Sequence, residues 1–268
     1  MPYKLIALDM DGTVLGSDKK LSPGVLTAMQ QAIDSGIIVT ISTGRPIVAM
    51  RNYREILELV DTPIITYNGA KVIDPRDQRV LYQENLDQRA AKEIFLRGEA
   101  FGTVQCVWSN DRLYLSKHNE KTQQYVGLSK IEASLVTDID EILAQGSVTK
   151  ILWIDDAPTI ARYQEELAGT LPEAVTSCTS SPRFLEFFSS KVSKGLALQF
   201  LGEHHDIAQA EIIAVGDADN DISMLEYAGL GVAMGNATDA IKAGADFVTL
   251  TNDEGGVAHV IEKFLLFP

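Results

Sequence analysis

Two aspartates spaced by one residue, Asp9 and Asp11, follow an apolar run at residues 5–8 and stand directly before Gly12. Open α/β sheets bind their ligands at the carboxyl ends of strands, where these acids are expected. Successive strand side chains point to opposite faces, so the two carboxylates share a site only if the chain bends between them, and a glycine permits that bend. Such a pair binds a hard cation, or one acid attacks as a nucleophile while the other moves protons. Taken alone, the segment also fits an Asx-type turn.

A second acidic cluster, at residues 216–221, follows another apolar run about 200 residues further along the chain. If both runs are strands of one parallel sheet, their carboxyl ends lie at the same edge and the two clusters converge. Sites made only of carboxylate oxygens suit Mg²⁺, which keeps several waters and is usually completed by a substrate phosphate. The alternative for Asp217 and Asp219 is that they cap the helix that follows.

Two further segments offer groups that bind phosphate. Lys194 precedes an expected helix, where its ammonium would neutralise a phosphate, and Thr43 offers a hydroxyl and a backbone N–H next to Gly44. Taken alone, such a lysine is more often a solvated surface charge, and a Thr-Gly pair is usually an ordinary turn. Arg45 has two interpretations, a substrate contact at the rim of the site or a structural salt bridge, of which the salt bridge is favoured.

The elements that position these residues alternate at the start of the chain. Ser22 and Pro23 predict the start of a helix that ends before Gly36, and residues 37–42 predict a strand. This order indicates a right-handed crossover between parallel strands. Residues 64–67 and 71–73 form an expected hairpin around an Asn-Gly turn.

The pattern changes in the middle of the chain. Residues 84–190 predict hairpin-like strands mixed with helices, which is typical of an α+β domain. Beyond Lys194 the alternation of strands and helices returns. We therefore expect residues 1–83 and 191–268 to form one split catalytic core, and residues 84–190 to be an inserted cap.

Composition limits the classes of partner. A formal charge of −14 disfavours nucleic acid and anionic membrane surfaces. The two cysteines are too few for a disulfide framework, and the four histidines lie in no ligand spacing. Neither a secretory leader nor an apolar run of membrane-spanning length is found. These features predict a cytoplasmic protein that acts on a small molecule.

Together, the motifs resemble those of the haloacid dehalogenase superfamily of phosphatases, in its Cof-like branch with a large α+β cap. Four motifs occur in the expected order: Asp9-Met10-Asp11-Gly12-Thr13, Ser42-Thr43-Gly44-Arg45-Pro46, Lys194-Gly195 and Gly216-Asp217-Ala218-Asp219-Asn220-Asp221. Weaker similarity covers residues 67–70, 231–234 and 253–257. The resemblance implies an α/β fold, a Rossmann-like parallel sheet with an inserted α+β cap.

The resemblance also implies roles for single residues. Asp9 would attack phosphorus to give an aspartyl-phosphate, and Asp11 would protonate the leaving oxygen and then activate water. An aspartate at position 11 favours hydrolysis or mutase chemistry, because the related ion-pumping ATPases, which preserve the phosphoenzyme, carry threonine there. The implied ligands of Mg²⁺ are the Asp9 carboxylate, the Asp11 backbone carbonyl and Asp217, with Asp221 as a ligand or immediately behind one. The groups implied to hold the phosphoryl oxygens are Thr43, Gly44, Lys194, Asn220 and the backbone of Met10.

These roles agree with the physical demands of phosphoryl transfer, which needs in-line positioning and neutralisation of charge. The sequence thus favours a Mg²⁺-dependent phosphatase acting on a small phosphorylated metabolite, such as a sugar phosphate. A phosphomutase of the same superfamily is the alternative among enzymes. A non-catalytic metabolite-binding module would have no reason to keep all four motifs together.

Overall fold

The computed structural model describes residues 3–51, 53–60, 62–129, 131–136 and 138–266. The chain divides into two compact units. The core unit comprises Met1–Arg45, Met50–Gln83 and Ser193–Pro268, and the inserted unit comprises Pro46–Ala49 and Glu84–Val192. The assignment of residues 84–190 as an inserted cap stays a prediction.

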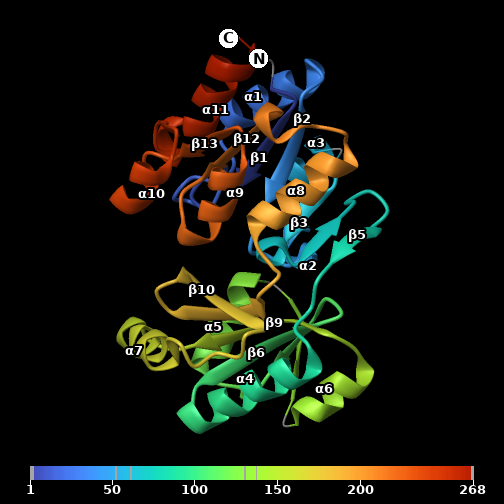
Figure 1. The fold of residues 1–268 in the computed structure, drawn as a ribbon, viewed down its shortest axis with the longest axis vertical. Coiled ribbons are helices and arrows are strands. Elements are labelled where there is room, and N and C mark those ends of the chain that lie inside the picture. Colours follow the sequence, from blue (N-terminus) through green and yellow to red (C-terminus); the bar gives the residue numbers. More distant parts are fainter. Residues whose placement is uncertain (1–2, 52, 61, 130, 137, 267–268) are drawn as a thin grey trace. The chain divides into compact units, whose positions relative to one another are not determined.

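The core unit is built on a sheet of eight strands in the order β14-β13-β12-β1-β2-β3-β4-β5. The six strands from β14 to β3 are parallel to their neighbours, and β4 and β5 are antiparallel. In Figure 1 the blue strand β1 lies beside the orange strand β12, so the two ends of the sequence build one sheet. The strands are β1 (Leu5–Asp9), β2 (Ile38–Ser42), β3 (Ile64–Thr66), β4 (Lys71–Ile73), β5 (Val80–Gln83), β12 (Ile212–Gly216), β13 (Leu230–Ala233) and β14 (Phe247–Val248).

Helices cover the parallel part of this sheet. Strand β1 is buried along its whole length, as expected for a parallel strand with both faces covered. Leu5 and Ala7 of β1 pack in one apolar cluster with residues of α8 and α9. The helices are α1 (Pro23–Asp34), α3 (Arg54–Leu59), α8 (Lys194–His204), α9 (Ile222–Tyr227), α10 (Asp239–Gly244) and α11 (Gly256–Ile261), followed by a π-helix at Glu262–Leu266. A further short helix, α2 (Ile47–Met50), lies at the boundary of the two units.

The local signals in the first βαβ segment act as expected. The Ser22 side chain caps α1 by accepting a hydrogen bond from the Val25 N–H at 3.2 Å, and Pro23 is the first helical residue. The hairpin of β3 and β4 also forms. Its connection is longer than the expected two-residue turn, because Tyr67–Gly69 forms a 3₁₀ turn instead.

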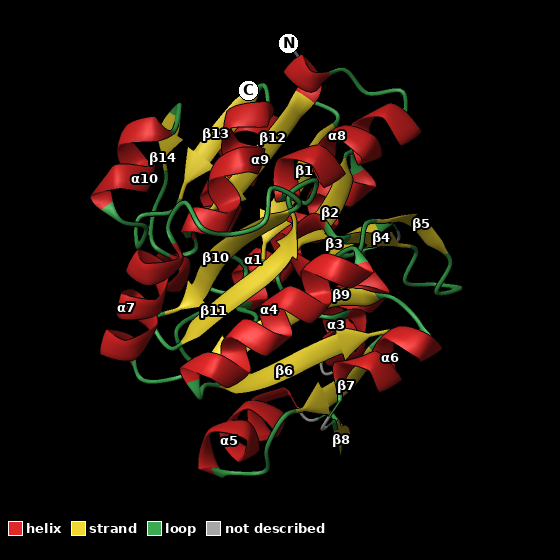
Figure 2. Cartoon of the chain, turned by 60° about the horizontal axis from the view of Figure 1, so that its bottom comes forward, coloured by secondary structure: helices red, strands yellow, loops and turns green. Residues whose placement is uncertain are grey.

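The inserted unit has one sheet of six strands in the order β10-β11-β9-β6-β7-β8. Figure 2 shows its strands in yellow beside the red helices α4, α6 and α7, which share one apolar cluster with the sheet. Its strands are β6 (Val104–Ser109), β7 (Arg112–Leu115), β8 (Ala133–Leu135), β9 (Val148–Ile154), β10 (Val175–Ser181) and β11 (Phe184–Ser189). Its helices are α4 (Gln88–Phe101), α5 (Glu120–Ser129), α6 (Ile139–Gln145) and α7 (Ala157–Leu167). Within the described ranges, no helix is long and apolar enough to cross a membrane.

Candidate active site

The predicted acids meet because their strands are neighbours in register. Asp9 is the last residue of β1 and pairs with Ser42, the last residue of β2. On the other side of β1, Leu8 pairs with Val215 of β12, so Asp217 follows its strand at the same edge of the sheet. Among the residues that the structure describes, Asp9, Asp217 and Asp221 bring carboxylate oxygens within 4.8 Å of one another. The two acidic clusters therefore converge, as the sequence predicts.

Lys194 lies in the middle of these acids at the start of α8. Its Nζ donates to Asp9 Oδ1 at 2.5 Å, to Asp221 Oδ1 at 2.5 Å and to the Ser42 carbonyl at 2.9 Å. The side chain is fully buried, and an ammonium has three N–H groups to donate, so each has a partner. Burial alone would lower the pKa of Lys194, but the charges of Asp221 and Asp9 raise that pKa above its ordinary value.

The remaining charge is unbalanced, because one ammonium faces three carboxylates. Burial and the charge of Asp221 raise the pKa of Asp9 well above its ordinary value, despite the opposing charge of Lys194. The same two causes raise the pKa of Asp217 to about 6. Adding a divalent cation would relieve this repulsion and return both groups to the carboxylate form. The oxygen-only donor set and its surplus of negative charge fit Mg²⁺.

Asp221 already uses both of its carboxylate oxygens within the protein. Oδ1 accepts from Lys194, and Oδ2 accepts from the backbone N–H groups of Asp217 at 2.9 Å and Ala218 at 3.0 Å. The side chain is completely buried. It therefore fixes both the lysine and the loop that carries Asp217.

Asp11 lies apart from this carboxylate cluster. Gly12, at φ +90°, provides the expected bend after it, and a Cβ at this glycine would stand 2.3 Å from Asp217 Oδ2. Arg45 donates to both oxygens of Asp11, from Nε at 2.6 Å and from Nη2 at 2.8 Å, and Lys19 Nζ lies 3.3 Å from Oδ1. Burial would raise the pKa of Asp11, but the hydrogen bonds and charge of Arg45 outweigh it and lower that pKa. Arg45 thus forms a salt bridge, the interpretation that the sequence favoured.

Of the predicted phosphate-binding groups, Lys194 contacts Asp9 directly, and Thr43 follows Ser42, the residue that pairs with Asp9. Thr43 is buried and its backbone N–H donates to the Ile65 carbonyl at 2.9 Å, so this N–H is not available to a phosphate as expected. Its hydroxyl accepts from the Arg45 N–H at 3.1 Å and keeps its own O–H as a donor. Met10 is fully buried and its carbonyl accepts a hydrogen bond from the Leu15 N–H at 2.9 Å, so the expected contact of its backbone with a phosphate stays a prediction. Asn220 donates from Nδ2 to Asn68 Oδ1 at 2.9 Å.

Two asparagines outside the four motifs also support the site. Asn68 holds Asn220, and Asn236 donates from Nδ2 to the Gly12 carbonyl at 2.9 Å and to Asp217 Oδ2 at 3.3 Å. Thr13 adds a hydrogen bond to Asp217 Oδ1 at 3.1 Å. The Asn-Gly turn indicated a hairpin at Asn68, and the weak family similarity of residues 67–70 gave this side chain no role. Asn236 follows a strand and a glycine, with no charge or spacing to mark it.

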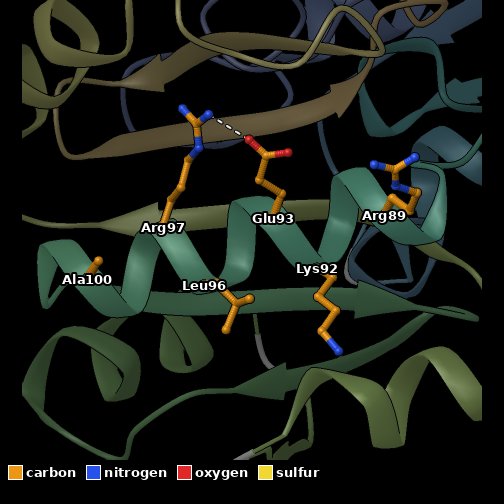
Figure 3. A pocket seen from close by; sticks show the side chains of 6 residues that line it. All are labelled: Arg89, Lys92, Glu93, Leu96, Arg97 and Ala100. Atoms are coloured by element: carbon orange, nitrogen blue, oxygen red, sulfur yellow. Dashed lines mark hydrogen bonds and ion pairs between the residues drawn. The ribbon is translucent and has the colours of Figure 1, made fainter.

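A surface pocket lies elsewhere, on α4 of the inserted unit (Figure 3). Its lining residues are Arg89, Lys92, Glu93, Leu96, Arg97 and Ala100. Figure 3 shows Arg97 directed toward Glu93, to which it is paired at 2.6 Å, and Lys92 pairs with Asp140 at 2.5 Å. These residues come from one face of one helix, and none of the predicted site residues is among them.

A family model described as haloacid dehalogenase-like hydrolase matches residues 6–261. The chain belongs to this family. A putative phosphatase of Bacillus subtilis is 32% identical over 273 residues, covering 98% of this chain and 99% of that protein. A second relative from Bacillus subtilis, a 5-amino-6-(5-phospho-D-ribitylamino)uracil phosphatase, is 33% identical over 267 residues, covering 98% of this chain and 97% of that protein.

Solved structures agree with this membership. A haloacid dehalogenase-like hydrolase from B. subtilis superposes with a TM-score of 0.87 at 32% identity, over 98% of this chain and all of that one. A phosphatase of the superfamily from Bacteroides thetaiotaomicron superposes with a TM-score of 0.85 at 27% identity, over 98% of this chain and 95% of that one. The fold class predicted from the sequence is confirmed, and the chain is a phosphatase of the haloacid dehalogenase-like family.

Proposed function

We propose that this phosphatase hydrolyses small phosphate monoesters in a Mg²⁺-dependent reaction through a phosphorylated Asp9. The observation that carries the proposal is the meeting of Asp9, Asp217 and Asp221 within 4.8 Å at the strand ends, beside the buried Lys194. Lys194 contacts one oxygen of Asp9, which leaves the other as the nucleophile. Asp9, Asp217 and the Asp11 carbonyl would hold the cation, and Asp221 would position Lys194 and the Asp217 loop. When bound, Mg²⁺ would neutralise charge on the phosphoryl group and keep Asp9 ionised.

The first step forms a bond from an Asp9 carboxylate oxygen to phosphorus and breaks the bond from phosphorus to the ester oxygen. Asp11 donates a proton to the departing oxygen, so the alcohol leaves neutral. Lys194 and the Thr43 hydroxyl face the oxygens of the phosphoryl group and balance its charge. In the second step Asp11 removes a proton from water, and the water oxygen forms a bond to phosphorus while the bond from phosphorus to the Asp9 oxygen breaks. The products are inorganic phosphate and a free Asp9.

The Arg45 salt bridge sets the state from which Asp11 acts. Two guanidinium hydrogen bonds hold its carboxylate ionised and fixed in orientation. Asp11 must therefore gain a proton, or draw away from Arg45, before it donates to a leaving group. We expect substrate binding beside Asp11 to shift this balance.

We further propose that the substrates are small phosphorylated metabolites such as sugar phosphates. The B. subtilis relative named as a 5-amino-6-(5-phospho-D-ribitylamino)uracil phosphatase supports a phosphorylated polyol chain as one class to test. The experiment is phosphate release with Mg²⁺ across a panel of sugar, polyol and nucleoside phosphates, compared by kcat/KM. Transfer of a radiolabelled phosphoryl group to the protein, absent in Asp9→Asn, tests the intermediate. Phosphate release without any labelled protein in rapid-quench samples would contradict it, and return of the phosphoryl group to a second position of the substrate would indicate a mutase.

A further inference from the structure

The turn at Tyr67–Gly69 is unusual for its backbone. Tyr67 and Asn68 have φ angles of +53° and +56°, in the left-handed region that residues with a side chain rarely adopt. Both side chains are buried, with 0% and 5% exposed, so this is not a loose surface turn. Strained backbone in a buried position persists only where the surroundings hold it, and it clusters at functional sites. No step of the proposed reaction uses a residue of this turn.

The backbone of this turn touches two of the segments that form the site. The Asn68 N–H donates to the Thr43 carbonyl at 3.0 Å, and the Tyr67 N–H donates to the Arg45 carbonyl at 3.1 Å. Gly69, at φ +104°, lies so close to the start of α8 that a Cβ there would stand 2.1 Å from the Ser193 carbonyl oxygen. The turn thus fixes the loop that carries Thr43 and lies directly against the residue before Lys194.

The Asn68 side chain adds a third segment. Its Oδ1 accepts from Asn220 Nδ2 at 2.9 Å, across 152 residues of sequence. The same oxygen lies against Gly44, where a Cβ would stand at 2.7 Å. Within the part of the chain that the structure describes, Asn220 Oδ1 is buried without a hydrogen-bond partner, so the contact to Asn68 is what orients this carboxamide. A carboxamide has two N–H groups, and this contact uses one of them.

We propose that Asn68 is a positioning residue of the phosphate site, which sets the Asn220 carboxamide so that its second N–H faces a phosphoryl oxygen. The inference rests on the proposed function, because it takes Asn220 as a phosphate ligand. Asn68 does not touch the phosphate in this scheme. It acts through Asn220, and it leaves the carboxylates that would hold the cation unchanged.

The first test compares Asn68→Gly with Asn110→Gly. Glycine adopts positive φ readily, so each variant keeps its turn and loses only a side chain. Asn110 is the matched control, since it has a φ of +49° and its Nδ2 donates to the Gln145 carbonyl in the inserted unit, which contains none of the predicted site residues. Calorimetry with inorganic phosphate, in the presence of Mg²⁺, measures the ligand affinity directly. We expect Asn68→Gly to weaken phosphate binding about tenfold, the size of one hydrogen bond to a charged group, while Asn110→Gly leaves it unchanged.

A second measurement distinguishes the loss of Asn220 positioning from a general loss of structure. Mg²⁺ affinity, measured by calorimetry without phosphate, should stay within about twofold of the wild-type value in Asn68→Gly, because that change lies outside the carboxylate cluster. Equal losses of Mg²⁺ and phosphate affinity would overturn the proposal. If Asn68→Gly does not fold, Asn68→Ser replaces it, since its hydroxyl is too short to reach Asn220 and the same loss of phosphate affinity is expected.

A double-mutant cycle decides whether Asn68 acts through Asn220. We expect Asn68→Gly combined with Asn220→Ala to bind phosphate no more weakly than Asn220→Ala alone, because the second change removes the group that the first would misplace. Losses that multiply would show that Asn68 acts independently and would refute the inference. The failure of the proposed function looks different, because wild-type protein would then neither bind phosphate with Mg²⁺ nor release it from esters.

Discussion

Each unit buries a lysine beside acidic side chains, but the two clusters differ in their balance of charge. In the inserted unit, Lys150 of β9 pairs with Glu186 of β11 at 3.1 Å, and both side chains are at most 5% exposed. In the core unit, Lys194 meets Asp9 and Asp221 at 2.5 Å each, with the Asp217 carboxylate close by. A pair of opposite charges satisfies itself, whereas three carboxylates beside one ammonium leave two negative charges unbalanced and need another cation.

This difference separates a structural cluster from a chemical one. Carboxylates that lie close together and have strongly shifted pKa values are candidates for functional residues, because their repulsion does not stabilise the fold. Burial first, and then the charge of Asp221, raise the pKa values of Asp9 and Asp217. The Lys150–Glu186 pair instead joins two neighbouring strands of one sheet, where it fixes their pairing. Removing one carboxylate should therefore have opposite effects on the stability of the two units.

The largest effect is expected for Asp9→Asn. The amide keeps the shape of the side chain but cannot form an aspartyl-phosphate, so kcat should fall by at least about 10⁴-fold. In metal-free protein the melting temperature should hold or rise, because one of three repelling carboxylates is gone. Steady-state phosphate release and thermal unfolding measure the two outcomes. Residual turnover above a few per cent, with deamidation excluded by mass spectrometry, would rule out Asp9 as the nucleophile.

Removing the metal tests whether the surplus of negative charge at the strand ends of the core unit requires a cation. EDTA should abolish phosphate release and Mg²⁺ should restore it, whereas Ca²⁺ should substitute poorly because its looser coordination disturbs in-line geometry. Mg²⁺ at about 100 times its dissociation constant should also stabilise the fold by about 2.7 kcal/mol, since it binds only the folded site. Asp217→Asn should lose most of this stabilisation. Full activity in a rigorously metal-depleted sample would refute the metal requirement.

Removing a carboxylate from the Lys150–Glu186 pair should lower the stability of the fold instead of preserving it. Glu186→Gln leaves the Lys150 ammonium buried without its carboxylate and should destabilise the protein by about 3 kcal/mol. The double change Lys150→Met with Glu186→Leu should recover most of that loss, because two apolar groups replace two charges. Denaturant unfolding measures both variants. If Glu186→Gln were as stable as the wild type, the ion pair of Lys150 and Glu186 would contribute nothing to the free energy of unfolding.

The strand ends could be predicted from the sequence because parallel strands align their carboxyl ends, which brings Asp9 and Asp217 together whatever the loops do. Strand β5 was not predicted, since it is a half-buried edge strand with no clear alternation. Strand β8 was missed because it is largely exposed and forms no apolar run, unlike the equally short but buried β3 and β4. The engagement of the Thr43 backbone N–H by Ile65 depends on where β3 lies beside the end of β2, which spacing along the chain does not encode. The roles of Asn68 and Asn236 could not be predicted either, because their hydrogen-bond partners lie in loops that are distant in the sequence.

The smallest effect is a dependence of stability on pH that arises from Asp217. Its pKa is raised from an ordinary value of 3.8 to about 6, so the folded protein binds this proton more tightly than the unfolded chain does. Stability from this group is therefore fully present below about pH 4 and is lost as the pH rises through about 6, by up to about 2 kcal/mol for a partly exposed group. Denaturant unfolding in EDTA across this range measures the fall.

Two variants and one ligand isolate the source of this pH dependence. Asp217→Asn should flatten the fall between about pH 4 and pH 6, because the titrating group and its repulsion are both removed. Asp34→Asn, a change at an exposed residue of α1, should leave the slope as it is in the wild-type protein. Saturating Mg²⁺ should flatten the slope as well, and its affinity should weaken as protons compete for Asp217 below about pH 6. A slope that persists in Asp217→Asn would place the titrating group elsewhere, and the surplus of charge at the strand ends would then not be what distinguishes the core unit from the inserted one.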